Sequence, residues 1–279
     1  MSIRFYAPAR LGHMGFACLV SLTALLTSCV SIFGPSQEEL RKIEIVRTQK
    51  SIIISFLNKG LPGIALKELR KHIREHPTDA DFKNLMGLTL LALKEPAEAT
   101  GHFKKAIKID DKISYRLNLA SAHIEANQLG KALYQLRAIE KHTEWPDYKH
   151  PERVYHNSGL AYERQNNIRK AEKLYKKALR ANPEFYISIM RIARIYENRN
   201  KLKSARRFYH RAKKLCSICF EPVGGIASTM LKSERPTSAI KVLSSFLKQK
   251  TSSKQDRKKA EQMLGNARNY ARATKRYSR

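Results

Sequence analysis

The feature that most constrains the fold is an internal repeat with a period of 34 residues. Residues 155–183 form its clearest copy, and two further copies follow in the same register. Three copies precede it, and one of these is offset by 33 residues instead of 34. Five copies have two small residues that lie twelve residues apart, and the first copy has only the second of the two. These small residues are Ala65, Gly87, Ala99, Ala120, Ala132, Gly159, Ala171, Ala193, Ala205, Ala227 and Ala239.

Each copy of the repeat predicts a pair of amphipathic helices, because its apolar residues recur at spacings of three and four. The small residues let the two helices approach closely, and large apolar residues fill the space between them. Turns containing Pro77, Asp111 or Pro183 separate successive pairs. We therefore predict an all-α solenoid of about six helix pairs over residues 46–253, stabilised by contacts between neighbouring pairs.

This pattern resembles the tetratricopeptide repeat, and the resemblance covers residues 46–253. It implies a right-handed superhelix that binds proteins on the concave face, which is lined by the first helix of each pair. The apolar residues predicted to face this groove are Ile54, Leu57, Leu88, Leu91, Leu117, Ile124 and Leu160. Such a trough would accept an amphipathic or extended segment of a partner. Alternatively, some of these residues pack against the neighbouring repeat.

The N-terminus departs from the repeat pattern. Arg4 and Arg10 precede an apolar run over residues 14–26, and no acidic residue occurs before Glu38. This order is typical of a secretory signal peptide. A retained membrane anchor is the alternative, although the run is shorter than the roughly 20 residues of a spanning helix.

The apolar run ends in Leu26-Thr27-Ser28-Cys29, which resembles a bacterial lipobox. The resemblance implies cleavage before Cys29 and acylation of its thiol, because the thiolate is a strong nucleophile. Val30 is not acidic, which implies sorting to the outer membrane of a Gram-negative cell. Two or three acyl chains would give stable anchoring. Residues 1–28 are then the signal peptide, and residues 29–45 the lipidated linker and the start of the first helix.

The chain is strongly basic, with 54 Lys and Arg against 24 Asp and Glu. Residues 1–28 contain two of the basic residues and none of the acidic ones, so the mature net charge is +28. Such a charge is typical of nucleic-acid binding, but secretion argues against that partner. The basic residues are also scattered along the helices. The alternatives are a solvated basic surface, or attraction to acidic partners, anionic lipids or cell-wall polymers.

Cys216 and Cys219 form a Cys-x-x-Cys motif between the fifth and sixth copies. In an oxidising compartment the expected outcome is a disulfide, and the alternatives are free buried thiols or a metal or redox site. A zinc site needs four ligands, and His210 is the only other candidate nearby. We predict no metal and no cofactor. No catalytic constellation is present, so the chain is not expected to be an enzyme.

Two segments depart from the repeat. Residues 141–151 form an enlarged linker that contains Trp145, the only tryptophan. This linker is either a packed loop or a contact for a partner, because aromatic residues on loops are enriched at binding hot spots. Residues 254–279 are predicted to form a capping helix that ends in a frayed basic tail beginning at Arg272.

A further resemblance concerns the whole chain. The stretch from His150-Pro151-Glu152-Arg153 to Asn157-Ser158-Gly159-Leu160 is similar to one in the secretin pilotins of type IV pili, which are outer-membrane lipoproteins with six tetratricopeptide repeats. The resemblance implies a non-enzymatic factor that binds secretin subunits and promotes their localisation and multimerisation in the outer membrane. A lipoprotein scaffold for cell-wall enzymes is the alternative.

Overall fold

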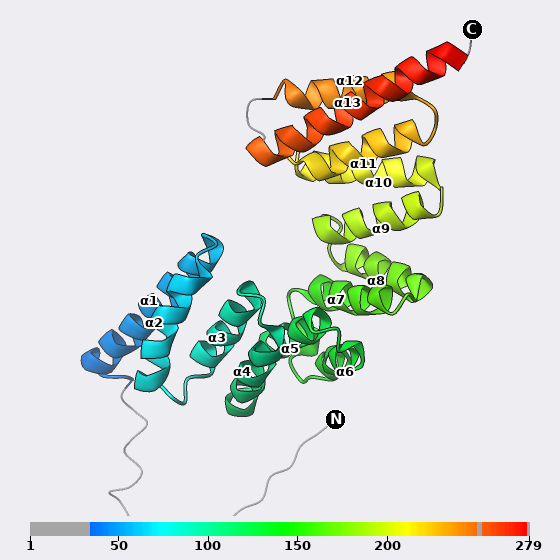
Figure 1. Cartoon of the computed structure of the whole chain (residues 1–279). Helices are drawn as coiled ribbons and strands as arrows, with labels where there is room; N and C mark the ends of the chain where they lie inside the picture. The colour runs from blue at the N-terminus through cyan, green and yellow to red at the C-terminus, as the bar shows by residue number, and fades with distance from the viewer. Residues whose placement is uncertain (1–33, 250–252, 278–279) are drawn as a thin grey trace, which may run out of the picture. The chain divides into compact units, whose positions relative to one another are not determined.

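The computed structural model describes residues 34–249 and 253–277, and within them every long regular element is an α-helix (Figure 1). The prediction of an all-α array of six helix pairs followed by a C-terminal helix is confirmed. The pairs are α1 (Gln37–Asn58) and α2 (Pro62–Glu75), α3 (Ala80–Ala92) and α4 (Pro96–Ile109), α5 (Ile113–Glu125) and α6 (Leu129–Glu140), α7 (Pro151–Arg164) and α8 (Ile168–Ala181), α9 (Tyr186–Asn198) and α10 (Leu202–Leu215), and α11 (Phe220–Leu231) and α12 (Pro236–Leu247), with α13 (Lys254–Tyr277) after them.

Two units make up the chain, Met1–Gln49 and Lys50–Arg279. In the first unit, the start of α1 is fixed by a reciprocal cap. The N–H of Ser36 donates to Oε2 of Glu39 at 2.7 Å, and the N–H of Glu39 donates to Oγ of Ser36 at 3.2 Å. These bonds satisfy two of the backbone donors that a helix N-terminus leaves free. Cys29 lies outside the described residues.

The turn inside each of the six pairs has one residue with a positive φ angle, between 55° and 70°. Around Lys94, the N–H of Glu95 donates to the carbonyl of Leu90 at 2.9 Å, and the N–H of Lys94 donates to the carbonyl of Leu91 at 3.1 Å. This pair of bonds is the Schellman ending of a helix. The residues at this position are Gly60, Lys94, Asn127, Asn166, Asn200 and Glu234.

Small residues bring the two helices of a pair together around one large side chain. A Cβ atom at Gly87 would lie 2.6 Å from the Phe103 ring, and one at Gly159 would lie 2.7 Å from the Tyr175 ring. Both rings are fully buried. The glycines are therefore needed for close approach, as the repeat pattern predicts. Gly225 has the same relation to Tyr209, at 2.4 Å, but belongs to the following pair.

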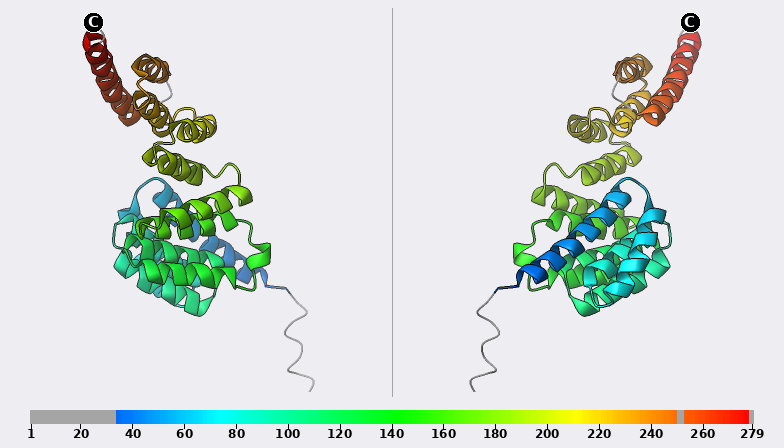
Figure 2. Two further views of the ribbon diagram at one scale, coloured as in Figure 1. Left: turned by 90° about the vertical axis from the view of Figure 1, so that its right-hand side faces the viewer. Right: turned by 90° about the vertical axis from the view of Figure 1, so that its left-hand side faces the viewer.

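Helix α13 covers the last pair. Ala260, Leu264 and Ala267 join one apolar core with residues of α11 and α12, including Leu243 and Phe246. Figures 1 and 2 show α13 beside both helices. The helix continues to Tyr277, so the expected frayed tail from Arg272 onward begins as helix instead. Its Ala- and Arg-rich sequence favours this extension.

The enlarged linker contains a short 3-10 helix, Trp145–Asp147, and is a packed loop. The Trp145 ring stacks on Tyr148 and meets Tyr155 edge to face, with centroids 6.0 and 5.9 Å apart. Trp145 and Tyr148 also pack against the core that joins α5, α6 and α7. The tryptophan therefore fills space between the third and fourth pairs.

Cys216 and Cys219 are joined by a disulfide, with their Cα atoms 5.4 Å apart. Cys216 ends α10 and Cys219 precedes α11, so the bond closes the turn between the fifth and sixth pairs.

No cluster of His, Cys, Asp or Glu in the described part of the chain could hold a metal ion. Across residues 34–249 and 253–277, no helix has the length and apolarity required to cross a membrane.

We expect Lys94→Gly to raise the free energy of unfolding by about 1 kcal/mol, because glycine removes the Cβ clash of the left-handed conformation. The matched control is Asn166→Gly, which should change stability less, since asparagine tolerates this conformation. Urea unfolding followed by circular dichroism measures both. A less stable Lys94→Gly variant would contradict this account of the turns.

Candidate protein-binding groove

The first helices of the second, third and fourth pairs are linked by a row of polar side chains. Nδ2 of Asn118 on α5 donates to Oδ1 of Asn84 on α3 at 2.8 Å. Nδ2 of Asn157 on α7 donates to Oγ of Ser121 on α5 at 2.9 Å. We call Asn84, Asn118, Ser121 and Asn157 the amide row. All four side chains are partly exposed, so the row lies at the surface formed by the first helices.

The amide row can bind a polypeptide backbone. A side-chain amide has two donor hydrogens and an acceptor oxygen, and each bond described above uses only part of this capacity. Among the described residues, Oδ1 of Asn118 and Oδ1 of Asn157 accept no hydrogen bond. An extended peptide presents N–H and C=O groups alternately, so repeated amides along its path match its hydrogen-bonding needs.

A pocket of about 270 Å³ opens at this row. Helices α5 and α7 supply its polar wall, and the start of α9 adds apolar surface through Ile187, which is 47% exposed. Arg153 is exposed at the rim and has no ion pair within the described residues. The full lining is Leu117, Asn118, Ser121, Arg153, His156, Asn157, Phe185 and Ile187.

His156 forms the buried side of this pocket and is only 6% exposed. Its Nδ1 lies 2.9 Å from Oγ of Ser188, and its ring contacts those of Tyr175 and Phe185 at centroid distances of 5.3 and 5.6 Å. Burial, followed by the charge of Arg191, lowers the pKa of His156 to about 4. The imidazole is therefore neutral near pH 7 and provides a polar group without charge.

The predicted groove residues have different exposures in the structure. Ile54 is 45% exposed, whereas Leu57, Leu88, Leu91 and Leu160 are half-buried. These five side chains lie on first helices and retain accessible apolar surface.

The prediction is wrong for Ile124 and largely wrong for Leu117. Ile124 is 1% exposed because Leu133 of α6 and Ala161 of α7 pack against it. Leu117 is 6% exposed and belongs to the core between α5, α6 and α7, although its edge lines the pocket. Ile124 therefore provides no groove surface, and Leu117 provides only its edge.

Sequence reasoning missed the amide row. Its signal was the occurrence of Asn84, Asn118 and Asn157 on consecutive first helices. Asparagine is a poor helix former, so its return two or three residues before the small residue of each helix indicates a role for the amide.

The groove changes character toward the C-terminal pairs. Glu197 of α9 accepts a hydrogen bond from Oγ of Ser228 at 2.6 Å and pairs with Lys232 at 2.8 Å. Burial opposes the charge of Glu197, but the bonds from Lys232, Ser228 and Tyr209 lower its pKa overall. This end of the first-helix surface is therefore ionic, whereas the amide row is uncharged.

Comparison with known proteins identifies the architecture. The sequence profile of the tetratricopeptide repeat matches residues 152–185, which span α7 and α8. The structure matches that of PilF from Pseudomonas aeruginosa with a TM-score of 0.62 and 17% identity, covering 80% of this chain and 99% of that one. This chain has the tetratricopeptide-repeat superhelical fold. Proteins with this fold are typically non-enzymatic scaffolds for protein interaction.

Other solved structures give similar TM-scores. PilW, a widely conserved type IV pilus biogenesis factor, gives a TM-score of 0.62 at 14% identity, with coverage of 77% of this chain and 97% of that one. Yeast Tom70 gives 0.60 at 16% identity, and the match covers 76% of this chain but 44% of Tom70. A sequence comparison with curated proteins returns no match.

The low pKa of His156 predicts acid sensitivity. The unfolded chain binds a proton near pH 6.5 and the folded chain only near pH 4, so stability falls as the pH drops through this window. We expect wild type to lose up to about 3 kcal/mol more than His156→Gln between neutral pH and pH 4. Urea unfolding at several pH values measures the difference. Equal pH dependence of the two proteins would contradict the prediction.

Proposed function

We propose that this protein is a pilotin, an outer-membrane lipoprotein that binds the secretin of the type IV pilus and promotes its localisation and multimerisation. The likeness to PilF and PilW supports the proposal, because it extends over 99% and 97% of those chains. PilW is a type IV pilus biogenesis factor. The number of helix pairs also agrees with the resemblance stated above.

In this proposal the amide row holds an extended segment of the secretin. Asn118 and Asn157 bond to the backbone of the segment, while Ile187 and the edge of Leu117 contact its apolar side chains. Arg153 favours an acidic residue in the segment, because its guanidinium is exposed and unpaired within the described residues. The pocket therefore selects an extended, apolar stretch that carries a negative charge.

The acyl chains on Cys29 would hold the complex at the outer membrane, facing the periplasm. Residues 30–36 separate this cysteine from the start of α1, so the anchor lies near the first helix in the sequence. Binding and anchoring are then carried by different parts of the chain and can be tested separately.

We expect Asn118→Ala with Asn157→Ala to weaken binding of secretin peptides by about thirtyfold, because two hydrogen bonds worth about 1 kcal/mol each are lost. The matched control is Asn266→Ala with Asn269→Ala, the same chemical change on exposed positions of α13. Fluorescence anisotropy with labelled peptides from the periplasmic part of the secretin gives the affinities.

Affinity that is equal in both double variants would contradict binding at the amide row. Pull-down from cells identifies the partner independently. Recovery of secretin supports the pilotin proposal, whereas recovery of a peptidoglycan hydrolase without secretin would replace it with the cell-wall scaffold.

We expect Cys29→Ala to abolish labelling by radioactive palmitate, because the acceptor thiol is absent. The protein should leave the outer-membrane fraction, and secretin multimers should decrease. Cys216→Ala with Cys219→Ala is the control, since it removes two cysteines but leaves the lipobox. Labelling that persists in Cys29→Ala would overturn the anchor.

A further inference from the structure

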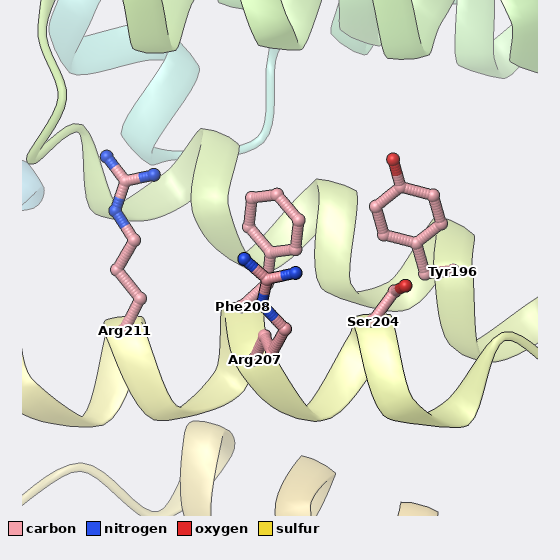
Figure 3. Close-up of a pocket in the computed structure, with 5 residues that line it drawn as sticks. All are labelled: Tyr196, Ser204, Arg207, Phe208 and Arg211. Carbon is pink, nitrogen blue, oxygen red and sulfur yellow. The ribbon is translucent and has the colours of Figure 1, made fainter.

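A second pocket lies mainly on α10, the second helix of the fifth pair, and shares no residue with the amide row. Its volume is about 330 Å³. Figure 3 shows the five lining side chains on the same side of α10. They are Tyr196 of α9 and Ser204, Arg207, Phe208 and Arg211 of α10.

The two arginines of this pocket lack carboxylate partners. Arg211 donates from Nη2 to the carbonyl oxygen of Pro183, which holds its side chain against the turn between α8 and α9. Arg207 is exposed, and neither residue has an ion pair among the described residues. Their spacing of four residues places both side chains on one helix face. Two positively charged side chains thus share one helix face without an internal counter-ion.

The surroundings do not neutralise this charge. Helices α8 and α10 carry six Lys or Arg residues each, and α10 has no carboxylate. The single carboxylate of α8, Glu172, is 13% exposed and is already paired with Lys176 at 2.6 Å and with Arg199. The hydroxyl of Tyr196 also donates to Glu172, at 3.2 Å. The pocket therefore has a net positive charge of its own.

The floor of the pocket is aromatic. The rings of Tyr196 and Phe208 lie 5.6 Å apart between centroids, tilted by 36°. Oγ of Ser204 adds a hydroxyl that can donate a hydrogen bond. The pocket therefore combines two guanidinium groups, a hydroxyl donor and an apolar surface. Arginine binds phosphate oxygens with two parallel N–H donors, and two arginines match the charge of a dianion.

We propose that this pocket binds the phosphate group of an organic phosphate ester. Arg207 and Arg211 contact the phosphate oxygens, and Phe208 packs against the organic part of the ester. Both a soluble phosphate ester and the headgroup of an acidic phospholipid present this chemistry. The site uses no residue of the amide row, so it is independent of the pilotin proposal.

The test compares Arg207→Gln with Arg211→Gln against a control of equal charge change. The control is Lys203→Gln with Lys214→Gln, two exposed positions on the same helix that do not line the pocket. Glycerol 3-phosphate is the soluble probe, followed by titration calorimetry and phosphorus NMR. Vesicles of phosphatidylcholine with and without phosphatidic acid are the lipid probe, followed by flotation.

We expect the arginine variant to lose about a hundredfold in affinity for the probe that binds, because a charge-assisted bond is lost at each position. The lysine variant should keep most of the affinity. Binding of glycerol 3-phosphate identifies a soluble ester site, and binding of phosphatidic acid vesicles alone identifies a headgroup site. Equal losses in both variants would overturn the proposal, because they would indicate general attraction to a basic surface. Failure of the wild type to bind either probe would also overturn the proposal.

Discussion

The close approach of two helices around one buried ring is the constraint on which the rest of the structure depends. The Tyr175 ring is fully buried and lies where a Cβ of residue 159 would be, so the contact requires glycine. Phe103 has the same relation to Gly87. Each ring fixes the distance between the helices of its pair, and therefore the direction in which the first helix presents its outer side chains.

Contacts between pairs depend on that arrangement. A single helix pair cannot bury its apolar face alone, so its stability comes from its neighbours. The bonds of Asn118 to Asn84 and of Asn157 to Ser121 cross between first helices and add polar links to the apolar core. The same amides retain unused oxygen atoms at the surface. One set of side chains therefore both links neighbouring repeats and leaves hydrogen-bonding groups free at the surface.

Much of the fold could be predicted from sequence. The apolar spacing defines each helix, and the small residues define the contact between the two helices of one pair, so both signals lie within a short stretch of chain. The groove was harder to predict, because exposure there depends on the adjacent pair. Leu91 and Ile124 occupy equivalent places four residues after Gly87 and Ala120, yet Leu91 is half-buried and Ile124 is covered by α7. The sequence of α5 alone does not show which of its side chains α7 covers. The amide row has no apolar periodicity, and its bonds join residues of different pairs, so the repeat pattern does not reveal it.

The two surfaces of the array differ in charge, and this bears on what the net charge of +30 means. Along the amide row the side chains are neutral, and His156 stays neutral because burial lowers its pKa to about 4. On the second helices, α10 alone carries six basic residues and no acid. In the proposed function, a peptide in the groove would thus be recognised mainly by hydrogen bonds and apolar contact, with Arg153 as the local charge. Much of the excess charge lies on the second helices α8 and α10, so the basic composition and the uncharged amide row belong to separate surfaces.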